Sequence, residues 1–225
     1  MLVDSKGTLW VGTRRGVCRF DGTKFTPFPI PRARVEEPRI KFFQNFAFGM
    51  TEDRDGNLWF AMDGEGVRKF DGESFRSYTT KDGLGSNNMR SAYTDRQGRL
   101  WFGTFDNVFS RLEGSTFINI TKKDGLPPSM GRRLIQDQAG NYWFDFGRYD
   151  GKSFTTFREN GDSFKGLPES AGVMDVFEDK DGRIWLGCTT GLWRVKEGQI
   201  INVTVEGPWP ETKRRSSAGK NRKTR

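Results

Sequence analysis

A nine-residue pattern recurs five times along this 225-residue chain and constrains its fold more than any other feature. Each copy runs from an aspartate through a glycine to a tryptophan among apolar residues, as in Asp95-Arg-Gln-Gly-Arg-Leu-Trp101-Phe-Gly. The tryptophans of the five copies are Trp10, Trp59, Trp101, Trp143 and Trp185, separated by 49, 42, 42 and 42 residues. A period of this length is typical of an architecture in which every repeat is one supersecondary unit.

One repeat has the pattern of four antiparallel strands joined by tight turns. In the third copy, strands are expected at residues 89–94, 100–104, 108–112 and 116–121, with Gly98 and Gly114 in two of the turns. The strand that carries the tryptophan is apolar on both faces, which indicates a sheet covered on both sides. Because no segment combines a 3.6-residue period with helix caps, we expect almost no helix.

Such sheets bury both faces only when neighbouring repeats stack against them. The sequence therefore predicts an all-β fold, a β-propeller of four-stranded blades with about five repeats of ~42 residues; a linear solenoid is the alternative. Only residues 1–3 are available for the first strand of the first blade, and Pro208 and Pro210 stand where a C-terminal strand would replace it. An incomplete ring or a fragment is thus favoured over a closed five-bladed ring. We place the repeats near residues 1–42, 43–88, 89–130, 131–172 and 173–207.

The charge of the chain is concentrated at its C-terminal end. The net charge is +8, and the last fifteen residues contain seven lysines and arginines but a single glutamate. We therefore divide the chain into a nearly neutral propeller, residues 1–207, and a basic tail, residues 208–225, that is expected to be disordered. A nucleic acid is not the expected partner, because a specific binding arm would need more than a charge run.

Residue types that are scarce exclude several classes of function. The chain has no histidine, so a Ser–His–Asp triad and a histidine zinc site are excluded. Its two cysteines, Cys18 and Cys188, do not form a CxxC pair. We therefore predict no catalytic residue, no metal site and no cofactor, and the chain is not expected to be an enzyme. No apolar run approaches the ~20 residues of a membrane span.

Residues 53–60 and 66–75, followed by Thr79-Thr-Lys-Asp-Gly-Leu84, closely resemble the two-component regulator propeller repeat. The resemblance extends over roughly residues 3–205. It implies a periplasmic, ligand-sensing β-propeller of a hybrid histidine kinase, with a kinase transducing domain or another protein as partner. Residues 1–4 have neither the basic nor the apolar region of a signal peptide, so a cytoplasmic location is expected if the chain is complete.

Ligands of propellers usually enter at the mouth of the central channel, which is lined by loops from one end of every blade. Arginine suits carboxylates, sulfates or phosphates, whereas Asn, Asp and aromatic rings suit sugars. The candidate ligand-binding residues in these loops are Arg14, Arg15, Asp63, Glu65, Asn88, Arg90, Phe105, Asp106, Asn107, Arg132 and Arg133. We predict a non-catalytic sensor of a small molecule or an oligosaccharide. A protein-interaction scaffold is the alternative, and a streptogramin-lyase-like enzyme is less favoured because such a lyase is expected to use a histidine base.

Overall fold

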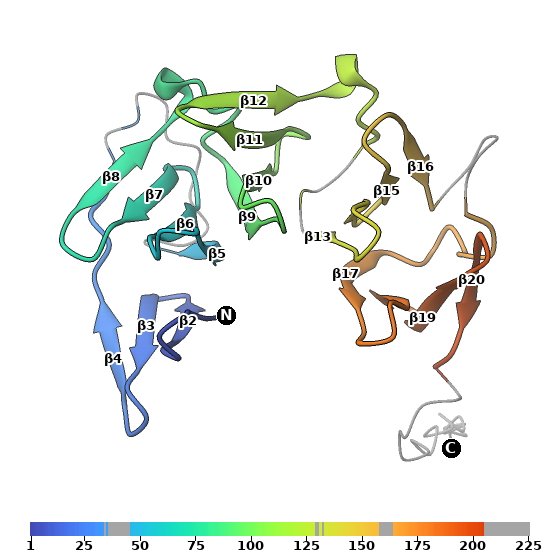
Figure 1. The fold of residues 1–225 in the computed structure, drawn as a ribbon, viewed down its shortest axis with the longest axis horizontal. Coiled ribbons are helices and arrows are strands. Elements are labelled where there is room, and N and C mark those ends of the chain that lie inside the picture. The colour runs from blue at the N-terminus through green and yellow to red at the C-terminus, as the bar shows by residue number, and fades with distance from the viewer. Residues whose placement is uncertain (34, 36–45, 129–130, 132, 158–163, 205–225) are drawn as a thin grey trace, which may run out of the picture.

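The computed structural model describes residues 1–33, 35, 46–128, 131, 133–157 and 164–204. These residues form five four-stranded antiparallel sheets, and the strands of each sheet are paired in sequence order. The sheets stand side by side in an arc (Figure 1). From the second sheet onward the first strand of each sheet lies nearest the centre, and we call the first strand of every sheet its inner strand. The prediction of an all-β propeller with four-stranded blades is confirmed.

Each repeat supplies one sheet. The first contains β1 (Leu2–Val3), β2 (Leu9–Thr13), β3 (Gly16–Phe20) and β4 (Phe25–Phe28). The second contains β5 (Ala47–Glu52), β6 (Leu58–Met62), β7 (Gly66–Phe70) and β8 (Phe75–Tyr78). The third contains β9 (Met89–Thr94), β10 (Leu100–Thr104), β11 (Phe109–Glu113) and β12 (Thr116–Ile120). The fourth contains β13 (Leu134–Gln136), β14 (Tyr142–Phe144), β15 (Gly147–Tyr149) and β16 (Phe154–Thr156). The fifth contains β17 (Val173–Glu178), β18 (Ile184–Cys188), β19 (Gly191–Lys196) and β20 (Gln199–Asn202).

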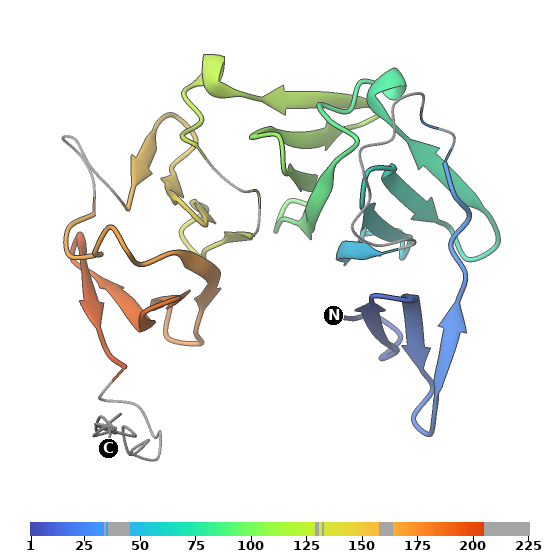
Figure 2. The ribbon, with the colours of Figure 1, turned by 180° about the vertical axis from the view of Figure 1, so that it is seen from behind.

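The arc does not close into a ring. The first and fifth sheets stand on either side of an opening, which is visible from both directions (Figures 1 and 2). As the sequence predicts, the first sheet has a much reduced inner strand, because β1 contains only two residues. The expectation of an incomplete ring is therefore confirmed for the part of the chain that the structure describes.

The aspartate of each repeat closes the turn before the tryptophan strand. In the third repeat, Asp95 Oδ1 accepts the backbone N–H groups of Gln97 and Arg99, and Gly98 adopts φ +83° at the turn. Asp95 Oδ2 accepts the indole N–H of Trp101 at 2.9 Å. The other four repeats repeat this indole bond at 2.7 to 2.8 Å. These aspartates therefore hold the turns between the first and second strands of their sheets.

The tryptophan side of each sheet packs on the next repeat. We call this side the trailing face of a sheet and the opposite side its leading face. Trp59 on the trailing face of the second sheet, for example, joins a buried cluster with Leu100 and Phe102 on the leading face of the third. Equivalent clusters connect the first sheet to the second, the third to the fourth and the fourth to the fifth. Four apolar seams thus replace a single central core, as expected for stacked repeats.

A buried polar contact reinforces the seam between the third and fourth sheets. Tyr142 donates its hydroxyl to Asp95 Oδ2 at 2.8 Å. Burial and this hydrogen bond raise the pKa of Tyr142 to about 12. Burial alone would raise the pKa of Asp95 as well, but the bonds that it accepts from Trp101, Arg99 and Tyr142 hold that pKa below its ordinary value. The aspartate therefore remains ionised within the seam.

Two short 3₁₀ turns, η1 (Thr80–Asp82) and η2 (Lys122–Asp124), were not predicted from the sequence. In η1, Thr79 and Asp82 form a reciprocal capping box, and Gly83 ends the turn in the left-handed conformation at φ +92°. The next residue, Leu84, is 3% exposed in the seam. The Lys-Asp-Gly-Leu element thus anchors the chain as it passes between sheets. No helix among the described residues has the length and hydropathy needed to span a membrane.

Candidate functional site

Three inner strands carry a β-bulge near their N-terminal ends. The pairing register shifts between Ala47 and Gly49 in β5, and comparable shifts occur in β9 and β17. The residues left out of the ladder are Phe48, Arg90 and Met174, each eleven residues before the tryptophan of its repeat. A bulge changes the direction in which the side chain of the unpaired residue points, and bulges are frequent beside functional sites.

The bulge residues of β5 and β9 meet an aromatic side chain of the β10–β11 loop. The Arg90 guanidinium lies 4.3 Å from the centre of the Phe105 ring and 5.7 Å from that of Phe48. The two rings are 5.2 Å apart and nearly perpendicular, and Phe46 contacts Phe48 at 4.5 Å. All four side chains are half-buried, so the group offers aromatic edges and a cation at the inner side of the arc.

Polar groups adjoin these rings. Asp106 Oδ2 accepts hydrogen bonds from Asn88 Nδ2 at 2.6 Å and from the Ser86 hydroxyl. The Phe105 backbone N–H donates to the Asn88 carbonyl at 2.9 Å, which ties the β10–β11 loop to the start of β9. Asn107 completes the loop with φ +56°. We define the inner rim cluster as Phe46, Phe48, Asn88, Arg90, Phe105 and Asp106.

Asp63, in the β6–β7 turn, adds a buried acceptor beside this cluster. Its backbone N–H donates to the Phe46 carbonyl at 3.1 Å, and the residue is only 6% exposed. Its Oδ2 atom accepts no hydrogen bond from the described residues. A buried carboxylate oxygen normally has a partner, so a water or a ligand hydroxyl would satisfy it.

Glu65 has a different environment, although it belongs to the same turn. Its carboxylate accepts Arg68 Nη2 at 2.9 Å, the Ala33 N–H at 3.0 Å and Arg32 Nε at 3.2 Å. The Arg68 side chain is completely buried, and it also donates hydrogen bonds to the backbone carbonyl oxygens of Pro31 and Glu65. Glu65 therefore anchors residues 31–33 to the second sheet.

The remaining candidates lie on other sheets. Arg14 and Arg15 are exposed in the β2–β3 turn of the first sheet. Arg133 pairs with Asp175 through two bonds of 2.6 and 3.0 Å, which join the fourth sheet to the fifth. Arg132 lies outside the described residues, as does the predicted tail, residues 208–225.

The inner rim cluster therefore contains four of the predicted residues, Asn88, Arg90, Phe105 and Asp106, and two more, Asp63 and Asn107, lie beside it. Sequence reasoning missed Phe46 and Phe48. Phe48 could have been found by alignment of the repeats, because it occupies the repeat position of Arg90. No signal in the sequence distinguishes Phe46.

Two hollows lie elsewhere among the described residues. One, of about 240 Å³, follows the seam between the second and third sheets beside Trp59. The other, of about 460 Å³, lies on the trailing face of the fifth sheet beside Trp185. The described residues contain no group of three or more Cys, Asp or Glu side chains placed to hold a metal ion.

The stacked sheets define the chain as a protein of the β-propeller class. Residues 41–64, 83–106 and 166–190 match the model of the two component regulator propeller. These three segments therefore carry the repeat of this family, as the sequence resemblance predicted. No curated protein matches the sequence.

Solved structures with the same fold include two extracellular domains of putative hybrid two-component systems from B. thetaiotaomicron. One is 22% identical, with a TM-score of 0.68 over 97% of this chain and 31% of that chain. The other is 19% identical, with a TM-score of 0.66 over 87% of this chain and 27% of that chain. This chain thus spans less than a third of the length of either domain.

An enzyme shares the fold as well. A histidine-to-alanine variant of virginiamycin B lyase from Staphylococcus aureus, described as catalytically inactive and crystallised with quinupristin, is 14% identical. Its TM-score is 0.62 over 88% of this chain and 67% of that chain. At this level of identity the similarity establishes the fold and leaves the function to be argued from the site.

Proposed function

We propose that this chain is a non-catalytic, sensor-type propeller whose ligand binds at the inner rim cluster. The observation that supports the proposal is the pair of bulges that set Phe48 and Arg90 against Phe105, next to the carboxylate of Asp106. Aromatic surface with a few convergent polar groups is typical of sites for small organic ligands.

An oligosaccharide is the ligand class that suits these groups best. Asp106 accepts hydrogen bonds from hydroxyl groups, Asn88 both donates and accepts, and the phenylalanine rings offer apolar surface to the C–H face of a sugar. The buried Oδ2 atom of Asp63 is a further acceptor. Arg90 adds a cation that pairs with the carboxylate or sulfate of an acidic sugar.

The structural relatives support a role in sensing. Two of them are extracellular domains of putative hybrid two-component systems. We infer an extracytoplasmic location for this propeller, and a histidine-kinase domain or another protein as the recipient of its signal. A change in packing between sheets on ligand binding would transmit that signal.

Catalysis is not part of the proposal. The lyase with this fold is catalytically inactive as a histidine-to-alanine variant, whereas this chain contains no histidine. A lyase-like reaction would therefore need a different base. A gluconolactonase from Xanthomonas campestris also shares the fold, at 14% identity and a TM-score of 0.52. A panel of lactones and streptogramins is therefore the relevant assay, and turnover of any of them would contradict a non-catalytic role.

The binding proposal is tested by thermal shift with neutral and acidic oligosaccharides. We expect at least one of them to raise the melting temperature, and we expect Phe48→Ala and Arg90→Ala to abolish that rise. Matched controls are Phe25→Ala on β4 and Arg76→Ala on β8, which change the same residue types on outer strands. A rise that survives both inner-rim substitutions would show that the ligand binds elsewhere.

A further inference from the structure

The hollow of about 240 Å³ lies within the seam between the second and third sheets, away from the inner rim cluster. One wall is formed by the rings of Trp59 and Tyr78 on the second sheet, which stack on each other with their centres 5.3 Å apart. The facing wall is formed by Leu100 and Leu112, which are directly paired across β10 and β11. The hollow thus offers aromatic surface on one side and aliphatic surface on the other.

The neighbouring seam shows why this space is open. There the positions of Leu100 and Leu112 are held by Tyr142 and Tyr149, which form the corresponding pair across β14 and β15. The Tyr142 ring lies 4.8 Å from the ring of Trp101, and its hydroxyl bonds the turn aspartate of that seam. Two leucines therefore leave a space in which the next seam holds an aromatic ring.

Two cations lie beside this hollow. Lys69 lines it, with its ammonium group 5.6 Å from the centre of the Trp59 ring. Arg76 is directly opposite Lys69 in the β7–β8 ladder, and its guanidinium lies 4.9 Å from the centre of the Tyr78 ring. Neither cation is paired with an acid among the described residues. Like charges placed directly opposite each other on neighbouring strands destabilise a sheet, so an anion at this point would stabilise it.

The paired cations are particular to the second sheet. In the other four sheets the position of Lys69 is held by an arginine whose partner on the outer strand is uncharged. These pairs are Arg19 with Thr26, Arg111 with Ile118, Arg148 with Thr155 and Arg194 with Ile201. The repeat pattern therefore accounts for Lys69 but not for Arg76.

A third cation, Arg54, reaches the hollow from the turn before β6. Its Nη2 atom donates to the Arg96 carbonyl at 2.9 Å, and its side chain lies where a Cβ atom on Gly98 would be. The acids of the lining are Asp53 and Asp55. Asp53 already accepts an indole N–H and two backbone N–H groups of its own repeat, and Asp55 is exposed. Positive charge therefore predominates around the hollow.

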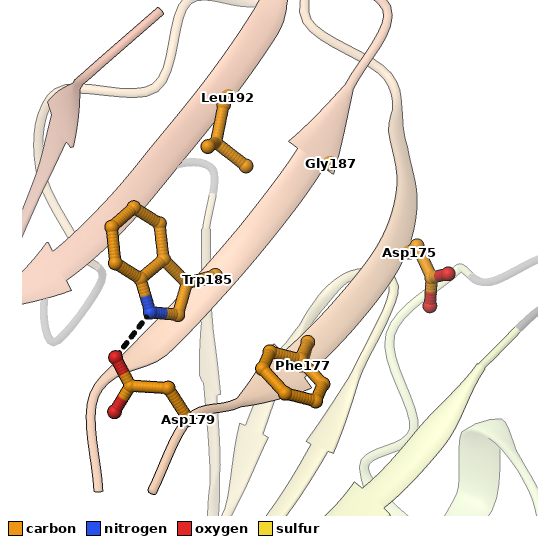
Figure 3. A pocket seen from close by; sticks show the side chains of 6 residues that line it. All are labelled: Asp175, Phe177, Asp179, Trp185, Gly187 and Leu192. Atoms are coloured by element: carbon orange, nitrogen blue, oxygen red, sulfur yellow. Dashed lines mark hydrogen bonds between the residues drawn. The ribbon is translucent and has the colours of Figure 1, made fainter. Parts of the chain in front are cut away.

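The larger hollow, on the fifth sheet, has the opposite character. It also lies beside the tryptophan of its repeat, and Figure 3 shows the Trp185 indole bonded to Asp179. Its lining includes Asp175 and Asp179 but no lysine or arginine. Cations are therefore a specific feature of the hollow beside Trp59 and are not shared by both hollows.

We propose that the hollow between the second and third sheets binds a small aromatic carboxylate. The ring of this ligand lies between Trp59 and Leu100, in the space that corresponds to the ring of Tyr142, and its carboxylate pairs with Lys69 and Arg76. A single ring suits the volume, which is smaller than the 300–1,000 Å³ that is typical of sites for drug-sized ligands. This site is separate from the inner rim cluster and does not depend on the function proposed for that cluster.

The test is a titration of the full ¹⁵N-labelled chain with benzoate, followed by NMR at the indole N–H of Trp59. We expect a saturable shift of this signal. Benzamide has nearly the same shape without the charge and should bind at least tenfold more weakly. An unmoved Trp59 signal, equal affinity for benzamide, or an equal response to sodium sulfate would overturn the proposal.

Three variants test the position of the ligand. Leu100→Tyr places a ring in the hollow and should abolish the saturable shift. Arg76→Thr introduces the residue type that the first sheet has at this position, and it should weaken benzoate binding at least threefold even if Leu100→Tyr does not fold. Arg194→Gln is the matched control, because it changes the cation of the Lys69 position in the fifth sheet, and it should leave the affinity unchanged. Unaltered affinity in Arg76→Thr, or binding that persists in folded Leu100→Tyr, would overturn the proposal.

Discussion

A matched pair of glycine substitutions measures how closely the sheets approach one another. Gly12 and Gly187 occupy the same repeat position, and neither requires a left-handed backbone. In Gly12→Ala, the new Cβ atom would lie 2.7 Å from the Ala47 carbonyl oxygen. That oxygen belongs to the backbone of β5, which cannot rotate away as a side chain would, so the seam between the first two sheets must open.

The expected cost follows from this geometry. Overpacking in a well-packed interior destabilises by about 1–3 kcal/mol, so we expect Gly12→Ala to lose roughly 2 kcal/mol. Gly187→Ala places its Cβ atom at 3.6 Å from Asp175 Cβ, an ordinary contact. Because alanine also restricts the unfolded chain, this variant should be neutral or about 0.4–1 kcal/mol more stable.

Urea and thermal unfolding, followed by circular dichroism, provide the measurement. For a domain of this size about 1 kcal/mol corresponds to a shift of 2–4 °C, so Gly12→Ala should melt roughly 4–8 °C below the parent. Gly187→Ala should melt at the parent temperature or slightly above it. Equal destabilisation by the two substitutions would refute the reasoning that the second sheet packs over Gly12 whereas no other sheet of the described residues packs over Gly187.

Three further outcomes follow from buried or hydrogen-bonded charges. The pKa of Tyr142 is raised from 10.0 to about 12, so its contribution to the free energy of unfolding is complete below pH 10 and is lost as the pH rises towards 12. Tyr142→Phe should therefore reduce the loss of stability at alkaline pH, as measured by urea unfolding. Backbone hydrogen bonds from Ser74 and Glu73 lower the pKa of Asp71 from 3.8 to about 2. The contribution of Asp71 to folding stability is therefore lost as the pH falls from 3.8 to about 2. Asp71→Asn should make the loss of stability with falling pH less steep. Arg68→Met leaves the Glu65 carboxylate buried without its main partner and should cost about 3–5 kcal/mol in urea unfolding, whereas a second substitution, Glu65→Gln, should restore part of it.

Much of the fold could be predicted because the repeat pattern encodes it locally. The expected strands of the third repeat lie within one residue of β9, β10, β11 and β12. Turn aspartate, glycine and tryptophan are close in sequence, so their hydrogen bonds need no knowledge of tertiary structure. The packing of the tryptophans between sheets followed from the two apolar faces of the strand that carries them.

The site was harder to predict, because its geometry depends on contacts between repeats. A bulge is a property of strand pairing, so the side chains of Phe48 and Arg90 could not be placed from the sequence pattern alone. Glu65 was predicted to face a ligand, whereas its carboxylate is buried against Arg68 and Arg32. A buried ion pair and two solvated charges have the same appearance in a sequence.

If the inner rim cluster binds a ligand as proposed, the bulges also separate recognition from stability. Their residues take no part in the ladder bonds of the inner strands, and the three positions carry side chains as different as Phe48, Arg90 and Met174. New specificities can therefore arise there by single substitutions, while the apolar stacking that keeps the protein folded stays intact.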